Sequence, residues 1–289
     1  METSIFTADE KLVALEFEIF DSLRALIADN RERIHKSASL IAEIDVYRSF
    51  AEVFGLKKSN LTTCQALANN YPNTTLTPHS TYSIQQRDFN ALLAGNTNLL
   101  TIHFKESEGE EQLFDNQGPL AEWYSSVGFE CDFLNFASPA ERIVRTIPAT
   151  QSVMFVHNSY VTQSDIDKIM GHFTAPVYWV LCPRSNRYIS GEITDAYKLL
   201  MANNLNILIG TDSLASNSSL SIIEELKMFR DIPLAELLQW ATINGAKALG
   251  IDNHYGTIEV GKRSGIVNIT GVDLENFTLT ASAQAKRVL

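Results

Sequence analysis

The sequence predicts an α/β fold of parallel βα units, preceded by a helical hairpin and followed by a small β segment. This prediction depends on three observations. Apolar residues recur at helical spacing over the first fifty residues, short apolar runs then alternate with longer amphipathic stretches, and glycines divide short β-type runs after Gly250. The corresponding parts of the chain are residues 1–54, 55–250 and 251–289.

Composition excludes several classes of protein. With 289 residues, 45% apolar content and 20% charged residues, the chain can bury a full core, which excludes disorder, a disulfide scaffold and a fibrous repeat. The net charge of −11 repels nucleic-acid phosphates, so we expect no nucleic-acid partner. The three cysteines are widely spaced and fit no disulfide framework, and no apolar run approaches the ~20 residues of a membrane helix. These features predict a cytoplasmic protein without a membrane partner.

The N-terminal segment, residues 1–54, has the pattern of two helices. Thr7 and Glu10 have the spacing of a capping box, and they open an apolar stripe that begins at Leu12. A second stripe begins at Ile34 and continues toward Phe50 without a strand signal. We therefore predict a helical hairpin, and its apolar stripes suggest a role in forming a homo-oligomer.

The middle part, residues 55–250, shows strand and helix patterns in alternation. The runs that predict strands are Thr74–Thr77, Leu99–Phe104, Val153–Val156, Val177–Leu181 and Asn206–Ile209, with Phe50–Phe54 as an earlier candidate. The stretches that predict helices are Ile84–Ala94, Ser164–Met170, Thr194–Ala202 and Leu234–Leu249. Gly250 is expected to end the last of them, and the glycine-punctuated residues 251–289 predict a small β subdomain.

Chemically reactive side chains fall at the ends of four predicted strands. His79, His103 and His157 lie at or just after three of them, and Asp212 follows the run Asn206–Ile209. In parallel α/β folds the functional groups collect at the carboxyl ends of the strands, so we expect these four residues to form one cluster. The alternative is that each histidine is a hydrogen-bonded structural residue.

Imidazole nitrogens and a carboxylate oxygen make a suitable ligand set for a divalent metal ion. Such an ion acidifies a bound water molecule into a nucleophile near neutral pH. Glu106 stands three residues after His103, where a carboxylate could move protons between that water and a substrate nitrogen. The alternative is a solvated residue in the acidic stretch that it forms with Glu108, Glu110 and Glu111.

Seven motifs follow one another along the chain from residue 77. They are TPHSTYS (77–83), TIHFKESEGE (101–110), FVHN (155–158), CPRSN (182–186), IGTDSLASN (209–217), ATINGAKALGI and GTIEVGKRSGIVNI. In this order they resemble the later two-thirds of an amidohydrolase-superfamily enzyme, of the cytosine and S-adenosylhomocysteine deaminase and chlorohydrolase type. The resemblance begins near residue 50 and implies an incomplete (β/α)8 TIM-type barrel, because we count five or six strands where closure needs eight.

The resemblance also implies roles for individual residues. His103 and Asp212 match metal ligands, and Asp212 also matches the group that relays a proton from the attacking water. Glu106 matches the general acid and base, and His157 matches a histidine that polarises or orients the reacting group. The residues assigned to substrate binding are His79, Ser185 and Asn186, the last two as a pair that positions the substrate or supports the site.

The chain departs from this family at its start. The family's first barrel strand carries a His-x-His pair with two further metal ligands, and this sequence contains no such pair. Because catalytic zinc usually has three protein ligands, we expect His103 and Asp212 alone to bind metal weakly. Residues 1–54 instead resemble a helical core segment of the mismatch-repair ATPase family MutS, which indicates a fusion or a chimera.

Taken together, these features predict a metal-dependent hydrolase that deaminates a purine, pyrimidine or related amino-heterocycle. The expected partner is this small-molecule substrate, with an adenine-bearing nucleoside among the candidates, and the expected cofactor is zinc, with iron or manganese as alternatives. The alternative function is that of a non-catalytic truncated or fused barrel, which acts only by binding or oligomerisation. Metal content after purification separates the two functions.

Overall fold

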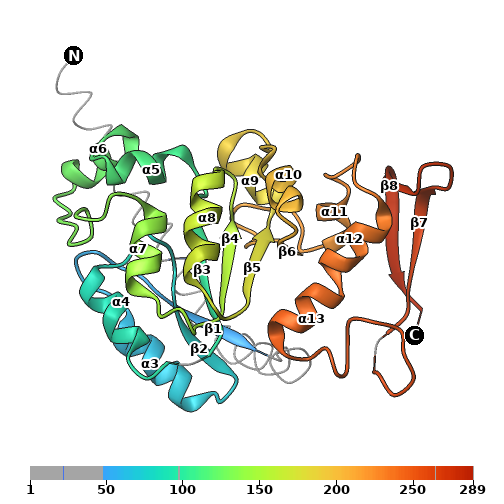
Figure 1. The fold of residues 1–289 in the computed structure, drawn as a ribbon, viewed down its shortest axis with the longest axis horizontal. Coiled ribbons are helices and arrows are strands. Elements are labelled where there is room, and N and C mark those ends of the chain that lie inside the picture. Colours follow the sequence, from blue (N-terminus) through green and yellow to red (C-terminus); the bar gives the residue numbers. More distant parts are fainter. Residues whose placement is uncertain (1–21, 23–47, 97, 264, 289) are drawn as a thin grey trace. The chain divides into compact units, whose positions relative to one another are not determined.

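The structure is a computed structural model that describes residues 22, 48–96, 98–263 and 265–288. The chain divides into two units between Tyr47 and Arg48, and the elements labelled in Figure 1 belong to the second unit, Arg48–Leu289. Most of the predicted helical hairpin, and with it the resemblance to MutS, therefore lies outside the described residues. Residues 49–53, which the 1–54 boundary assigned to the hairpin, form a strand instead.

Six parallel strands follow one another along the chain and in space. They are β1 (Ser49–Val53), β2 (Thr74–Pro78), β3 (Leu100–Phe104), β4 (Val153–His157), β5 (Val177–Leu181) and β6 (Asn206–Ile209). Backbone ladders join β1 to β2 and run from β3 through β6. The five strands predicted between residues 74 and 209 are confirmed to within one residue at each end, and the earlier candidate is β1. The predicted α/β class with a parallel sheet is therefore confirmed.

The contact between β2 and β3 is of a different kind. The buried hydroxyl of Thr77 accepts a hydrogen bond from the N–H of Thr101 at 2.7 Å and donates one to the carbonyl oxygen of the same residue. One side chain thus takes the place of a backbone ladder. Main-chain pairing is found only past the end of β2, where Ser80 and His103 form a bridge. This arrangement places the residues that follow β2 directly beside the end of β3.

Among the described residues, β1 and β6 are the outer strands, and side-chain amides cap a carbonyl of each. Nδ2 of Asn60 donates to the carbonyl oxygen of Glu52 at 3.0 Å, and Nδ2 of Asn244 donates to that of Ile207 at 2.8 Å. Unpaired main-chain N–H and C=O groups on an outer strand can form hydrogen bonds with strands of other chains. These two amides therefore reduce the exposure of a sheet that is not closed within the described residues.

Helices connect the strands and cover them. They are α3 (Leu61–Asn70), α4 (Gln86–Leu93), α5 (Glu108–Phe114), α6 (Gly118–Ser126), α7 (Pro139–Thr146), α8 (Gln163–His172), α9 (Pro183–Ser190), α10 (Ala196–Ala202), α11 (Ile222–Leu226), α12 (Leu234–Ala241) and α13 (Ile243–Leu249). Figure 1 shows α7 and α8 side by side over the strands. The main core lies between strands and helices and includes the fully buried Phe104, Phe155 and Trp179. Within the described part of the chain, no helix is long and apolar enough to cross a membrane.

The predicted helix Leu234–Leu249 is wrong in one respect, because it is two helices, α12 and α13. Thr242 interrupts it with a non-helical backbone (φ −130°, ψ −87°), and its hydroxyl donates to the carbonyl oxygen of Leu238 at 2.6 Å. A threonine hydroxyl competes in this way with the helical hydrogen bonds. The predicted stop at Gly250 is confirmed, since this residue ends α13 in the left-handed region at φ +69°.

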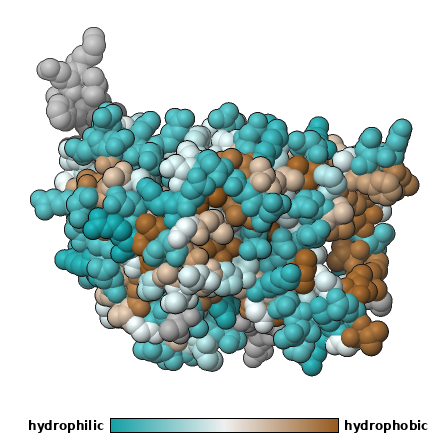
Figure 2. Space-filling model, in the orientation of Figure 1, coloured by the Kyte–Doolittle hydropathy of each residue, from teal (hydrophilic) through white to brown (hydrophobic). Residues whose placement is uncertain are grey.

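The C-terminal residues form an antiparallel ribbon of β7 (Val267–Asp273) and β8 (Thr278–Arg287). Ala283 of β8 is fully buried and belongs to the main core, whereas Val267 and Phe277 are more than half exposed. Figure 2 shows the resulting apolar surface along this ribbon. The ribbon is therefore attached to the rest of the unit by its core-facing side chains.

Candidate active site

Strained backbone marks the carboxyl ends of three strands. Lys105 after β3, His157 and Asn158 at the end of β4, and Asp212 after β6 have φ values of +52°, +78°, +58° and +55°. Residues other than glycine rarely adopt this conformation, and each instance costs of order 1–3 kcal/mol. Such strain collects at functional sites, and here it coincides with the strand ends that carry the predicted catalytic residues.

Three histidines form a row across the ends of neighbouring strands. The ring centroids of His79 and His103 lie 4.5 Å apart, and the rings of His103 and His157 stack at 5.0 Å. The carbonyl oxygen of His79 accepts hydrogen bonds from the main-chain N–H (2.9 Å) and from Nδ1 (2.6 Å) of His103. Burial lowers the pKa of His79 to about 4, and the neighbouring His103 adds to this effect. His79 is therefore neutral at physiological pH and can offer a ring nitrogen as a ligand or acceptor.

The carboxylate of Glu106 lies between a tyrosine and a histidine. The hydroxyl of Tyr82 donates to Oε2 at 2.6 Å, and Nε2 of His157 lies 3.5 Å from Oε1. Nδ1 of His157 donates to Oδ1 of Asn186 at 2.7 Å, which holds the ring with Nε2 facing the carboxylate. Nε2 is buried and has no hydrogen-bond partner among the described residues. This geometry suits the exchange of a proton between Glu106, His157 and a bound molecule.

Asp212 is held by two serines. Its Oδ2 accepts hydrogen bonds from the hydroxyls of Ser185, at 2.7 Å, and of Ser216. Burial acts to raise the pKa of Asp212, but the hydrogen bonds from Ser216 and Ser185 outweigh it, and the pKa lies below its ordinary value. Asp212 is therefore an anion. Of the pair predicted to bind substrate, Ser185 thus contacts Asp212 and Asn186 contacts His157, so both support the site in this structure.

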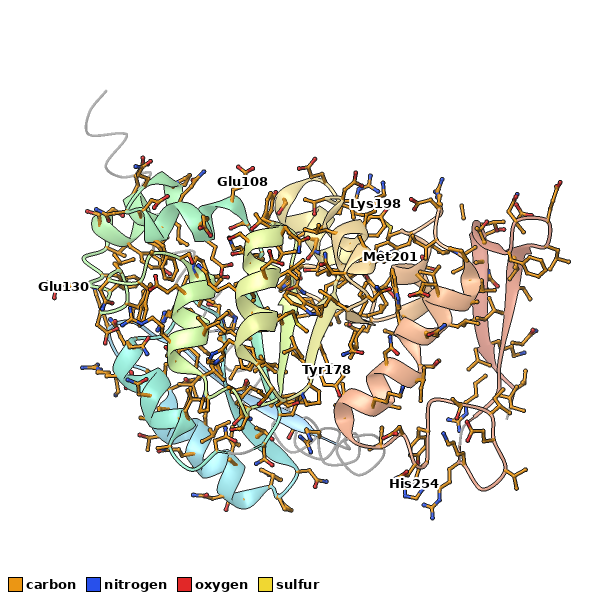
Figure 3. The ribbon with its side chains drawn as sticks, in the orientation of Figure 1. Glu108, Glu130, Tyr178, Lys198, Met201 and His254 are labelled. Atoms are coloured by element: carbon orange, nitrogen blue, oxygen red, sulfur yellow. The ribbon has the colours of Figure 1, made fainter. Side chains whose placement is uncertain are left out.

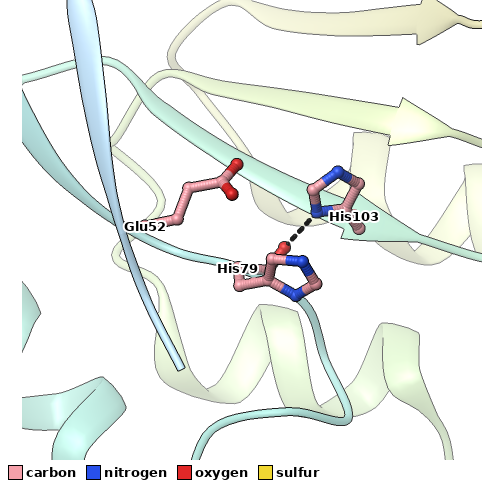
Figure 4. Close-up of side chains that lie close together, drawn as sticks. All are labelled: Glu52, His79 and His103. Carbon is pink, nitrogen blue, oxygen red and sulfur yellow. Dashed lines mark hydrogen bonds between the residues drawn. The ribbon is translucent and has the colours of Figure 1, made fainter. Parts of the chain in front are cut away.

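Glu52, on the outer strand β1, was not among the predicted site residues. One donor atom each of Glu52, His79 and His103 lies within 4.8 Å of the other two, and Figure 4 shows the carboxylate extending toward the rings. His103 is a predicted metal ligand, whereas His79 is predicted to bind substrate. Asp212, the other predicted ligand, is not a member of this group. The only signal in the sequence was a single acidic residue inside an apolar strand candidate.

An open cavity of about 570 Å³ adjoins the site. Arg184, Arg187 and Tyr188 of α9 line one part of it, and residues 214–218 line another. Ser216 belongs to the cavity wall and also donates to Asp212. Asp212 itself does not line the cavity, so the hydrogen bond from Ser216 is the link between this space and the carboxylate.

Glu110 is a fully buried acid next to Glu106. Its carboxyl oxygens accept hydrogen bonds from the hydroxyl of Thr81 and, at 3.1 Å, from the main-chain N–H of Glu106. Burial nevertheless raises the pKa of Glu110 to about 8, from an ordinary value of 4.5. A protonated carboxyl thus joins the loop after β3 to the loop after β2.

This pKa predicts a pH dependence of stability. Between pH 4.5 and about 8 the folded protein holds one more proton than the unfolded chain at Glu110. The free energy of unfolding therefore falls as pH rises through this window, by up to about 1.4 kcal/mol per pH unit. Glutamine does not titrate, and its side-chain oxygen can accept from the N–H of Glu106 while its amide N–H donates to the hydroxyl oxygen of Thr81, so Glu110→Gln should lack this slope. Urea titrations of both proteins from about pH 5 to about pH 8.5 measure it; parallel curves would contradict the raised pKa.

Comparison with known proteins identifies the family. The profile of the amidohydrolase family matches residues 52–288. Adenosine deaminase of Helicobacter pylori (strain ATCC 700392 / 26695) is 32% identical over 214 residues, which cover 70% of this chain and 51% of that protein. A 5-methylthioadenosine/S-adenosylhomocysteine deaminase of Thermoanaerobacter pseudethanolicus is 34% identical over 132 residues, 42% of this chain and 30% of that protein. The chain thus spans about half of the first relative and less of the second.

Solved structures show the same relationship. The aminofutalosine deaminase of Helicobacter pylori, in complex with methylthio-coformycin, has a TM-score of 0.65 and 26% identity, over 79% of this chain and 60% of that one. An adenosine deaminase from Xanthomonas campestris with bound zinc has a TM-score of 0.57 at 22% identity, over 76% of this chain and 51% of that one, which shows a shared fold alone. Because the family match runs from β1 to residue 288, the chain belongs to the amidohydrolase family.

Proposed function

We propose that this chain is a metal-dependent hydrolase that deaminates a purine, pyrimidine or related amino-heterocycle. The observation that carries the proposal is the position of Glu106, whose carboxylate lies between the hydroxyl of Tyr82 and Nε2 of His157. A carboxylate placed in this way can take a proton from water and deliver it to a leaving nitrogen. Hydrolytic deamination requires this transfer.

The relatives support the class of substrate. They are named as deaminases of adenosine and of 5-methylthioadenosine and S-adenosylhomocysteine, and one solved relative holds methylthio-coformycin. We infer that the substrate of this chain is an adenine-bearing nucleoside. The cavity of about 570 Å³ beside Ser216 has room for a molecule of that size.

The donor atoms at the strand ends fit the divalent metal ion that the family implies. Imidazole nitrogens and a carboxylate oxygen lie close together there, which is the ligand chemistry of zinc. The resemblance assigns His103 and Asp212 as ligands, and we propose zinc as the ion. When bound, zinc supplies a Lewis acid that makes water a nucleophile near neutral pH.

The side chains of the chain itself account for the proton transfers. Water adds to the carbon that bears the amino group, the C–N bond breaks, and the nitrogen leaves as ammonia. Asp212, an anion, accepts one proton of the attacking water, and the carboxylate of Glu106 accepts the other. Glu106 passes its proton to the departing amino nitrogen and the proton on Asp212 goes to the ring nitrogen, so both carboxylates are regenerated. His157, held by its hydrogen bond to Asn186, presents Nε2 to the reacting group. Tyr82 fixes the orientation of the Glu106 carboxylate.

Replacement of Tyr82 tests this last role. Burial raises the pKa of Tyr82, and the neighbouring Glu106 raises it further, so the hydroxyl remains a donor at neutral pH. We expect Tyr82→Phe to lower kcat roughly tenfold or more with little change in KM, because one hydrogen bond to a charged group is lost. A folded variant with the kcat of the parent would exclude this role.

A non-catalytic barrel is the second candidate function. It is favoured by the two outer strands of the described sheet and by the absence of a His-x-His pair from the sequence. An incomplete (β/α)8 barrel of this kind would bind a heterocycle or a second copy without hydrolysing anything.

Ammonia release separates the two functions. Protein loaded with Zn²⁺ and protein treated with a chelator are incubated with adenosine, 5-methylthioadenosine, cytosine and guanine. We expect the loaded protein alone to release ammonia, and to do so with an adenine-bearing compound. If protein with stoichiometric zinc releases none from any of them, the non-catalytic function is the one that remains.

A further inference from the structure

We propose that Glu52, His79 and His103 together bind the divalent metal ion, in place of the pair His103 and Asp212 that the resemblance assigns; Asp212 keeps its role in proton transfer. The three residues come from three successive parts of the sheet: Glu52 from β1, His79 from the residue after β2, and His103 from β3. One donor atom of each lies within 4.8 Å of the other two (Figure 4). The inference rests on the proposed function, because it names ligands for the ion which that activity requires.

The composition of this group meets the needs of zinc. Two imidazole nitrogens and one carboxylate oxygen make a His₂Glu set, which leaves a position open for water in catalytic zinc sites. Bonds of about 2.0–2.2 Å bring tetrahedral donors to about 3.3 Å from one another, so donors that lie within 4.8 Å must approach by up to about 1.5 Å. All three side chains are only partly buried, and rotation about their side-chain bonds can supply this movement.

Hydrogen bonds already orient both rings. A metal-binding histidine commonly donates its second ring N–H to a carbonyl or another acceptor, which fixes the tautomer and leaves the other nitrogen for the metal. Nδ1 of His103 has this relation to the carbonyl oxygen of His79, at 2.6 Å. Nδ1 of His79 pairs with Oγ of Ser83 at 3.0 Å, and that oxygen also accepts a hydrogen bond from Ser80. An ion bound through Nε2 of each ring would leave these partners in place.

The backbone of Glu52 is anchored as well. Its carbonyl oxygen accepts a hydrogen bond from Asn60, which fixes this part of the outer strand. Parallel pairing sets Glu52 opposite Thr77, two residues before His79, so the register of β1 on β2 determines which side chain of β1 reaches the rings. With these three residues as ligands, the chain has a complete set without the His-x-His pair that its sequence lacks.

Metal affinity tests the assignment independently of catalysis. The full chain is stripped with a chelator, and Zn²⁺ binding is measured by competition with a chromophoric chelator. We expect one ion per chain for the parent and at least about 100-fold weaker binding for Glu52→Gln and for His79→Asn, because each removes a ligand. Glu122→Gln, which changes an exposed glutamate on α6, should bind as the parent does. Parental affinity in Glu52→Gln would overturn the inference.

A measurement on the parent covers the case in which the variants fail to fold. X-ray absorption of the zinc-loaded parent counts imidazole ligands, and we expect two. A single imidazole would match His103 with Asp212 alone and would overturn the assignment. This result is distinguishable from a failure of the proposed function. Two imidazole ligands without ammonia release would support the metal site and contradict the deaminase activity. One imidazole ligand with ammonia release would support the activity and exclude Glu52 and His79 as ligands.

Discussion

The Glu106→Gln variant should lose about a thousandfold in kcat relative to the parent, as is typical when a general acid and base is removed. Glutamine has the size of glutamate, and its side-chain oxygen can still accept the hydrogen bond that Tyr82 donates to Glu106 at 2.6 Å. It cannot carry a proton from water to the leaving nitrogen. The loss should therefore appear in kcat, measured as ammonia release with saturating substrate, and much less in KM.

The matched control is Glu108→Gln. Glu108 is the first residue of α5, two residues further along the chain, and its exposed side chain points away from the ribbon (Figure 3). We expect this variant to keep kcat within about twofold of the parent, since surface substitutions have small effects. Zinc content should be unchanged in both variants. If Glu106→Gln retains zinc and a kcat within about tenfold of the parent, Glu106 does not transfer the proton.

The Arg142→Met variant should be less stable than the parent by roughly 3 kcal/mol. The guanidinium of Arg142 is completely buried and donates to the carbonyl oxygens of Thr81 and Ile84 and to the side chain of Gln86, and it lies 4.0 Å from the ring centroid of Phe133. Methionine preserves the apolar stem but leaves these buried acceptors without a donor, at a cost of about 1–3 kcal/mol each. Loss of the unpaired charge offsets part of this cost.

Activity should fall together with stability, because Arg142 holds the loop that carries His79 and Tyr82. The control is Arg145→Ala on the same helix, α7, where the side chain is 62% exposed and pairs with Glu141 four residues earlier. An exposed ion pair of this kind contributes little to stability, so Arg145→Ala should unfold close to the parent. Urea denaturation measures both variants. Equal stability of Arg142→Met and the parent would show that water or other donors replace the guanidinium.

The strands could be predicted from the sequence because each is a local pattern. A buried parallel strand such as Val177–Leu181 is a continuous apolar run, and the helices between strands show their own spacing. The break at Thr242 could not be predicted, since a helical pattern of apolar residues continues across it and the competing hydrogen bond to Leu238 depends on the backbone that forms. The spacing of apolar residues predicts that a helix forms here, but it does not predict where the helix is interrupted.

The candidate site shows the same limit. The positions of His103, His157 and Asp212 at strand ends followed from the alternation of elements. The side chains that contact these residues could not be predicted in this way. Glu52 lies near His79 only because β1 pairs with β2 in one register, and Tyr82 reaches Glu106 across 24 positions of sequence. Contacts of this kind are set by tertiary packing, which no spacing rule within one segment contains.

The hydroxyl of Thr77 takes the place of a backbone ladder between β2 and β3. Within the described residues, β1–β2 and β3–β6 are therefore two blocks, each with its own backbone ladders. Glu52 and His79 stand on one block, and His103 stands on the other. A cation bound by all three side chains would cross-link the two blocks. Release of the metal would then be coupled to separation of β2 from β3, the seam between the blocks. The amide hydrogens of Thr101 and His103, which bond across the seam to Thr77 and His79, should then exchange with solvent faster in chelator-treated protein than in zinc-loaded protein.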